Sequence, residues 1–164
     1  LRQNNVSNLI ISSVSEEVTV ISALERDYPN LLVLNSESYV PLKIDYESPK
    51  TLGIDRIAAV IGAISQFKGP LVVVHAVSCI TCDLVDNKNI FKRGTISPGL
   101  QMRLQAMHTF TSKLPLLNLT EPKQLVGSTT DEAMLSGAVN GSRLEITEII
   151  RQYQKKISRF NDFG

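Results

Sequence analysis

Three short runs of mostly apolar residues limit what this chain can fold into more than any other feature. The runs are Leu9–Val14, Leu31–Leu34 and Leu71–Val74. Short strands of this composition are typical of sheets that are buried on both faces. Residues 16–27, between the first two runs, place apolar side chains at helical spacing behind Ser15 as the expected cap. This β–α–β order predicts two parallel strands joined by a helical crossover.

The second half of the chain predicts an antiparallel meander. Apolar and polar residues alternate over Ile80–Val85, residues 86–89 predict a turn, and Ile90–Ser97 predicts a returning strand. With the run at 71–74 they make three successive strands. Residues 35–52, by contrast, are polar and irregular, and we expect a connecting segment there.

Three further helices are predicted from apolar spacing. The first covers residues 56–66, and the second covers Leu100–Phe110, with an apolar stripe that ends on its last residue. The third covers Thr130–Ile157 and follows a capping box formed by Thr129 and Glu132.

A meander of three strands followed by a helix is the opening of a ribonuclease-H-like unit. The β–α–β segment before it could close another such unit. We therefore predict an α/β fold of duplicated ribonuclease-H-like domains, the architecture of the acetate/sugar kinase–Hsp70–actin superfamily. The domain junction is expected near residue 52, which assigns residues 1–52 to the first domain and 53–164 to the second.

Composition excludes several classes of protein. Apolar residues make up 43% and charged residues 20%, as in a soluble globular protein. Because 17 basic and 16 acidic residues give a net charge of +1 and form no basic stripe, we expect no nucleic-acid partner. The longest apolar run, Leu71–Val77, is too short to cross a membrane. The two cysteines make no disulfide framework, so a cytoplasmic setting is expected.

The segment Gly53-Ile-Asp-Arg56 is the first candidate for chemistry, because it lies where a loop enters a helix. In one interpretation Asp55 only caps that helix. In the other, its carboxylate accepts a proton from a substrate hydroxyl while Arg56 binds an anion. Spacing alone favours the capping interpretation, because Asp is among the commonest caps, whereas the setting of the motif favours the functional one.

The segment from His75 to Asp83 is the second candidate. Its hairpin could present backbone N–H groups and the Ser78 hydroxyl to a phosphate, or it could be an ordinary turn. Cys79 and Cys82 have the spacing of a redox or zinc half-site. Positions three apart in a strand face opposite sides, however, and the chain has no second cysteine pair, so a metal or thiol module is the weaker reading.

The third candidate is the stretch from Gly127 to Gly137. It contains the capping box, and it could also offer N–H groups and the Thr130 hydroxyl to a polar substrate. Gly137 and Gly141 lie four residues apart in the predicted helix, where glycine lowers helix stability. We expect them to pack closely against another element, such as a second subunit.

Together these segments resemble the type III pantothenate kinases over nearly the whole chain. The likeness rests on short motifs in a fixed order, and the wording around Ser97–Arg103 is most similar to Bacteroidetes-type members. The motifs are Tyr46 with Pro49, Gly53-Ile-Asp-Arg56, Ser78-Cys-Ile-Thr81 with Asp83, Gly94-Thr-Ile-Ser-Pro-Gly-Leu100 with Arg103, Leu114-Pro115, and Gly127-x-x-Thr130 to Ser136-Gly137.

The resemblance implies an enzyme that phosphorylates pantothenate with ATP, the first step of coenzyme A biosynthesis. It implies a divalent metal (Mg²⁺), a monovalent cation (K⁺ or NH₄⁺) and a homodimer with the pantothenate site near the subunit interface. Asp55 would be the catalytic base. The other implied site residues are Tyr46, Gly53, Ile54, Arg56 and Thr130 for pantothenate, Ser78 for ATP, and His75 at the position of the monovalent cation.

Two departures from the family pattern bear on that activity. The family motif Asp-x-Gly-Thr is here His75-Ala-Val-Ser78, which replaces a hard oxygen ligand and adds a branched side chain at Val77. The family's first phosphate loop would precede Leu1 and its adenosine segment would follow Gly164, so both ends of the duplicated architecture are expected to be incomplete. The alternative is a non-catalytic pantothenate-binding or regulatory relative with a degenerate phosphate motif.

Overall fold

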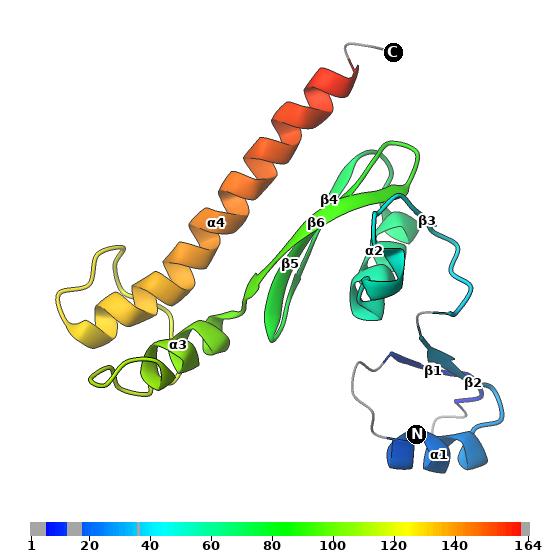
Figure 1. The fold of residues 1–164 in the computed structure, drawn as a ribbon, viewed down its shortest axis with the longest axis horizontal. Coiled ribbons are helices and arrows are strands. Elements are labelled where there is room, and N and C mark those ends of the chain that lie inside the picture. The colour runs from blue at the N-terminus through cyan, green and yellow to red at the C-terminus, as the bar shows by residue number, and fades with distance from the viewer. Residues whose placement is uncertain (1–5, 13–17, 36, 162–164) are drawn as a thin grey trace.

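The computed structural model describes residues 6–12, 18–35 and 37–161 as a mixed α/β fold (Figure 1). Two strands form one small sheet and four strands form a second, and a long helix lies at the C-terminal end. In chain order the elements are β1 (Leu9–Ser12), α1 (Val18–Asp27), β2 (Leu31–Leu34), β3 (Lys43–Ile44), a 3₁₀ turn (Pro49–Thr51), α2 (Ile54–Gln66), β4 (Leu71–Ala76), β5 (Cys79–Val85), β6 (Ile90–Pro98), α3 (Leu100–Thr109) and α4 (Thr130–Asn161).

The predicted β–α–β unit is present at the N-terminal end. Strand β1 pairs in parallel with β2, from Leu9 opposite Leu31 to Ser12 opposite Leu34, and α1 connects them. The expected cap Ser15 lies outside the described residues. The prediction of a fully buried strand is wrong for Ile10, which is 65% exposed because the described residues leave one face of this small sheet uncovered.

The predicted meander is confirmed, and it forms most of the larger sheet. Strands β4 and β5 pair antiparallel with His75 opposite Thr81, and β5 and β6 pair antiparallel with Cys82 opposite Thr95. The order of the strands in the sheet is β3-β6-β5-β4. A register shift at Leu84 and Val85 marks a bulge. Strand β3 was not predicted, because two residues show no alternation, and it exists through its parallel pairing with β6.

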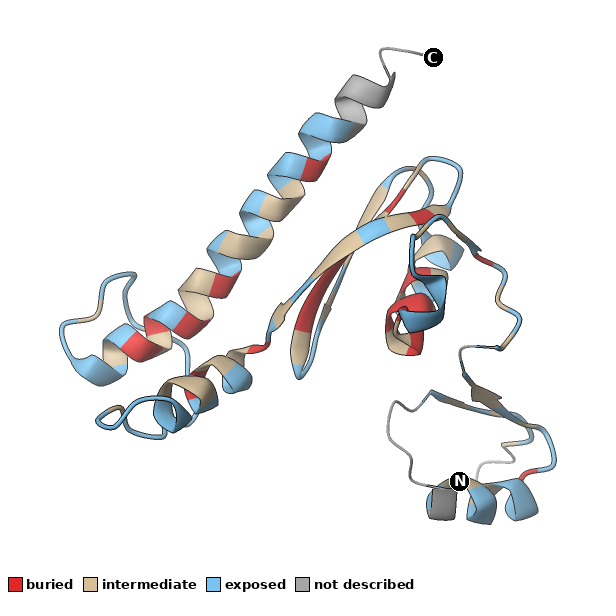
Figure 2. Cartoon of the chain, in the orientation of Figure 1, coloured by how far each residue is buried: buried red, intermediate tan, exposed pale blue. Residues whose placement is uncertain are grey.

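Helix α2 covers one face of this sheet and α4 lies on the other side (Figure 1). Alternation along the central strand β5 explains the arrangement, since neighbouring residues point to opposite faces. Asp83 and Val85 point toward α2, where Val85 joins the apolar core. The buried residues of that core are Leu42, Leu52, Ile54, Ile57, Val60, Val85 and Phe91. Figure 2 shows the corresponding buried residues of α2 and of the strands.

A second, smaller core joins α3 to α4 around Leu104, Met134 and Ala138. The prediction that Phe110 belongs to the apolar stripe of α3 is wrong. The helix ends at Thr109, so Phe110 leaves the helical repeat and its side chain is 85% exposed. No helix among the described residues is long and apolar enough to span a membrane.

Helix α4 begins with the predicted cap, in a slightly different form. The N–H of Glu132 donates to the hydroxyl of Thr129 at 3.2 Å. The Glu132 carboxylate also accepts from the N–H and the hydroxyl of Ser128, the residue before Thr129. These bonds from Ser128 hold the pKa of Glu132 below its ordinary value.

Candidate active site

Asp55 lies in the first turn of α2, one residue inside the helix. Gly53 occupies the N-cap position, and the helix start has no side-chain cap bond, so the capping interpretation of Asp55 does not describe the structure. The Asp55 side chain is 43% exposed. Its carboxylate is therefore open to solvent, at a helix end whose free N–H groups favour negative charge.

Gly53 makes room for that carboxylate. A Cβ atom built on Gly53 would lie 2.5 Å from Oδ1 of Asp55, which is far inside van der Waals contact. The backbone of Gly53 has φ −57° and ψ 132°, which any residue can adopt. The glycine is thus needed for the space above its Cα and not for its conformational freedom.

His75 lies on the other side of Asp55. It lies near the end of β4, on the same face as Val73, which packs against the α2 core. Its Nδ1 lies 3.9 Å from Oδ2 of Asp55, beyond hydrogen-bond reach. That nitrogen is buried and has no hydrogen-bond partner. The two oxygens of Asp55 therefore have different neighbours, Gly53 beside Oδ1 and His75 beside Oδ2.

Arg56 turns inward, next to Asp55 in sequence but in the opposite direction. Its Nε lies 3.1 Å from Oδ1 and 3.3 Å from Oδ2 of Asp83, and its Nη2 also contacts Oδ1. The two side chains are 5% and 0% exposed, and the guanidinium carbon lies 5.7 Å from the centre of the Phe91 ring. Burial alone would lower the pKa of Arg56, but Asp83 and Tyr46 outweigh it and the pKa is raised.

Gly94 permits this buried ion pair. A Cβ atom there would lie 2.1 Å from Oδ1 of Asp83 and 2.5 Å from Nη2 of Arg56. The motif Gly94-Thr-Ile-Ser-Pro-Gly thus opens with glycine because the Arg56–Asp83 ion pair occupies the space that a Cβ atom would need. Sequence analysis had singled out each of these residues separately but had not joined them. A carboxylate inside an apolar strand was the available signal, because a buried charge requires a partner.

Tyr46 borders a surface cavity of about 410 Å³ beside β6. Its ring meets Phe91 edge-on, with 5.8 Å between the ring centres. The cavity is lined by Asp45, Tyr46, Glu47, Ser48, Lys92 and Arg93. Asp55 is not among these residues, so the cavity and the Asp55 carboxylate are separate features of the surface described here. Lys92 and Arg93 had drawn no attention in the sequence.

Comparison with known proteins decides the family. A model of the type III pantothenate kinase family matches residues 1–152. This chain belongs to the type III pantothenate kinases.

Curated relatives agree with that assignment. The chain is 36% identical over 158 residues to the type III pantothenate kinase of Flavobacterium psychrophilum, covering 96% of this chain and 66% of the relative. The identity is 39% to that of Cytophaga hutchinsonii, covering 94% and 65%, and 37% to one from Bacteroides fragilis, covering 93% and 63%. The predicted likeness to Bacteroidetes-type members is confirmed. The chain spans a little under two thirds of the length of these relatives.

A solved structure supports the fold alone. A Campylobacter jejuni protein named as a Baf family transcriptional activator matches 89% of this chain and 65% of its own, with a TM-score of 0.57 and 23% identity. The mixed α/β character is established, whereas the duplication of a ribonuclease-H-like domain and the junction near residue 52 stay predictions.

The structure separates Thr130 from the other pantothenate residues implied by the family. Thr130 is the first residue of α4 and is exposed, whereas Asp55 is on α2, across the sheet (Figure 1). Ile54 is 7% exposed and belongs to the apolar core, so only its backbone faces the helix entrance. A single copy of the chain therefore brings together Gly53, Asp55 and His75 but not Thr130.

The implied nucleotide position lies at the tip of the β4–β5 hairpin. Ser78 is exposed, and its carbonyl oxygen accepts the N–H of Gly99 at 2.9 Å. A Cβ on Gly99 would lie 2.4 Å from the carbonyl oxygen of Val77, so this glycine lets α3 begin directly beside the turn. The N–H of Val77 donates to the carbonyl of Cys79 and is not free for a phosphate.

His75 does not fit the monovalent cation that the type III pantothenate kinase pattern implies at its position. A K⁺ ion takes oxygen ligands, whereas the atom that His75 directs inward is a nitrogen. Among the residues that the structure describes, no three His, Cys, Asp or Glu side chains gather as a metal site. No step of the chemistry is therefore assigned to a cation at this position.

The cysteine spacing also has a structural explanation. Cys79 and Cys82 are both free thiols, at opposite ends of a strand segment in which Cys82 is 1% exposed. Burial raises the pKa of the Cys82 thiol, and this disfavours the thiolate that redox chemistry or metal binding requires.

Proposed function

We propose that this chain acts in the transfer of the γ-phosphoryl group of ATP to the primary hydroxyl of pantothenate, with ADP and 4′-phosphopantothenate as products. The observation that carries the proposal is the Asp55 carboxylate, held open at the start of α2 above Gly53, in a chain of this family. Pantothenate would lie between that carboxylate and Tyr46. The residues that the family resemblance names for pantothenate and ATP are part of the proposal, whereas His75 as a cation ligand is not.

In this mechanism Asp55 orients the pantothenate hydroxyl and accepts its proton. The hydroxyl oxygen bonds to the γ-phosphorus, the bond from that phosphorus to the bridging oxygen breaks, and ADP leaves. Because the transition state of phosphoryl transfer is loose, the main contribution of the base is orientation. Arg56 lies beneath the substrate loop, where its ion pair with Asp83 would hold that loop in position.

ATP would approach the tip of the β4–β5 hairpin, where Ser78 offers a hydroxyl. Mg²⁺ would arrive with the nucleotide, since it keeps most of its ligands as phosphate oxygens and water and needs few protein carboxylates. A cytoplasmic location and the absence of a nucleic-acid partner remain part of the same proposal.

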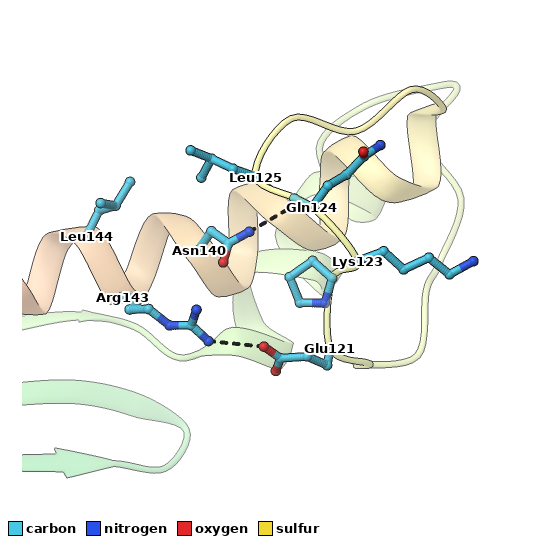
Figure 3. A pocket seen from close by; sticks show the side chains of 8 residues that line it. Glu121, Lys123, Gln124, Leu125, Asn140, Arg143 and Leu144 are labelled. Carbon is cyan, nitrogen blue, oxygen red and sulfur yellow. Dashed lines mark hydrogen bonds and ion pairs between the residues drawn. The ribbon is translucent and has the colours of Figure 1, made fainter.

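We also propose that the enzyme is a homodimer, because a complete pantothenate pocket would need Thr130 from a second copy. Helix α4 and the loop before it carry features that suit an interface. Gly137 and Gly141 have open space above them, and Leu125 and Leu144 are 63% and 60% exposed. Both leucines line a cavity of about 400 Å³ between α4 and residues 121–125. Figure 3 shows their side chains with the others that line it. A monomer at micromolar concentration in sedimentation velocity would contradict this assignment.

Pantothenate should stabilise the full-length protein against heat. A ligand at 100 times its dissociation constant stabilises a folded site by about 2.7 kcal/mol, which corresponds to a rise in Tm of roughly 5–10 °C for a protein of this size. The measurement is a melting curve with and without pantothenate, and β-alanine, which lacks the hydroxyl-bearing half, serves as control. An unchanged Tm at saturating pantothenate would remove the substrate assignment.

Gly53→Ala should lower turnover far more than it lowers stability. The new Cβ displaces the Asp55 carboxylate, and a misplacement of about 1 Å can reduce a rate about 100-fold. The backbone at Gly53 already suits alanine, so the melting temperature should hardly change. Kinetics and melting curves of the full-length variant test this prediction. Gly62→Ala is the matched control, because it adds the same atom to α2 in open space and should leave turnover unchanged. Equal activity of both variants would contradict it.

A further inference from the structure

His75 contains a polar atom that the fold leaves unsatisfied. Among the buried side-chain nitrogen and oxygen atoms of the described residues, its Nδ1 is the one without a hydrogen-bond partner. Buried polar groups in proteins are almost always paired, so an exception needs an explanation. The nearest charged group is Asp55, with its Oδ2 at 3.9 Å.

The strand that carries His75 fixes its Nδ1 beside Asp55. The position of this nitrogen therefore does not depend on the free rotation of a surface side chain. Alternation along β4 directs His75 toward α2, and the imidazole is only 32% exposed. The other two ionised groups of this region, Arg56 and Asp83, are bound to each other and are not available to either residue. Of these four groups, Asp55 and His75 are therefore the two that can still form a hydrogen bond with each other.

We propose that His75 is a positioning residue for Asp55 and donates a hydrogen bond from Nδ1–H to Oδ2 when substrate is bound. Donor and acceptor need to approach by less than an ångström, and catalytic hydrogen bonds are often long before substrate binds. With Oδ2 held, Oδ1 remains above Gly53 as the oxygen that accepts the hydroxyl proton. The inference rests on the proposed function, because it assigns a role toward the base of that reaction.

This role distinguishes His75 from the cation ligand implied by the family pattern. An imidazole N–H would hold one carboxylate oxygen of Asp55 through a directed hydrogen bond. A bound cation would hold that oxygen through charge alone. We therefore expect the activity of this protein to be the same in potassium and in sodium salts. If the wild-type protein and His75→Ala both required potassium, the cation would bind at another position. His75 would then not have taken the place of that cation.

Three variants of the full-length protein test the proposal. Asparagine at position 75 places an amide N–H near the location of Nδ1, glutamine places one near Nε2, and alanine provides neither. We expect His75→Ala and His75→Gln to lower kcat about 100-fold with an unchanged KM for pantothenate. His75→Asn should retain most of the turnover. Wild-type kcat in His75→Ala, or equal rescue by glutamine and asparagine, would overturn the proposal.

A second histidine supplies the control and a reference signal. Nδ1 of His108 lies 2.8 Å from the carbonyl oxygen of Leu114, which only accepts, so that nitrogen must carry a proton. His108→Asn should leave kcat unchanged. In ¹⁵N spectra recorded with pantothenate bound, His75 should show the same Nδ1–H signature as His108, and Asp55→Ala should abolish it. An unprotonated Nδ1 on His75 would overturn the proposal even if the protein proves inactive, whereas inactivity with the expected spectrum would count against the proposed function alone.

Discussion

Asp55→Asn should lower the kcat of the full-length protein for pantothenate phosphorylation by about 10²–10⁴-fold, the usual contribution of a positioned base. Asparagine keeps the size and the polarity of the side chain but cannot accept the hydroxyl proton. Stability should change little, because the carboxylate is 43% exposed and the neighbouring His75 lies beyond hydrogen-bond distance. Steady-state kinetics and melting curves of both proteins give the two quantities.

Glu148→Gln is the matched control for that experiment. It removes one carboxylate charge from an exposed helix position. Arg151 there lowers the pKa of Glu148 to about 2, far below its ordinary value. The control should keep wild-type kcat. If Asp55→Asn also retained wild-type kcat, Asp55 would not be the base, and the proposed mechanism would fail at its first step.

Asp83→Ala should cause the largest loss of stability of any single substitution discussed. It leaves the Arg56 guanidinium buried, 5% exposed, with no counter-charge, and breaking a buried pair in this way costs about 3–5 kcal/mol. Urea denaturation of the full-length protein measures the change in the free energy of unfolding. A loss of less than about 1 kcal/mol would show that the pair is not the structural centre of this region.

Two further proteins make the interpretation specific. The double variant Arg56→Met, Asp83→Leu removes both charges, so it should recover much of the stability that Asp83→Ala loses. Asp45→Ala removes a carboxylate that lies 2.6 Å from Lys92 but at the surface, and it should cost much less than Asp83→Ala. A double variant as unstable as the single one would attribute the loss to packing rather than to the unpaired charge.

The elements that sequence analysis predicted correctly are those set by local pattern. The parallel pair β1–β2, the meander β4–β6 and the long helix α4 each repeat an apolar spacing over several residues. Local pattern did not predict β3, whose two residues become a strand only by pairing with β6. It also placed Phe110 in the apolar stripe of α3, because apolar spacing alone does not show that the helix ends at Thr109.

The candidate site was predictable in its residues but not in its contacts. The motif at 53–56 was identified as a loop-to-helix junction, and the structure places it there. The pairing of Arg56 with Asp83 joins residues 27 positions apart, and the approach of His75 to Asp55 joins a strand to a helix. Such contacts depend on which face of each element is turned inward, and a local sequence pattern does not specify which partner lies opposite.

The most direct test is transfer of the γ-phosphoryl group from labelled ATP to pantothenate by the full-length protein. The account predicts labelled 4′-phosphopantothenate and an equal amount of ADP, both dependent on pantothenate. A folded protein that binds pantothenate and ATP but forms no product would contradict it and would favour the non-catalytic relative, whose His75 and Val77 then mark a lost phosphate motif.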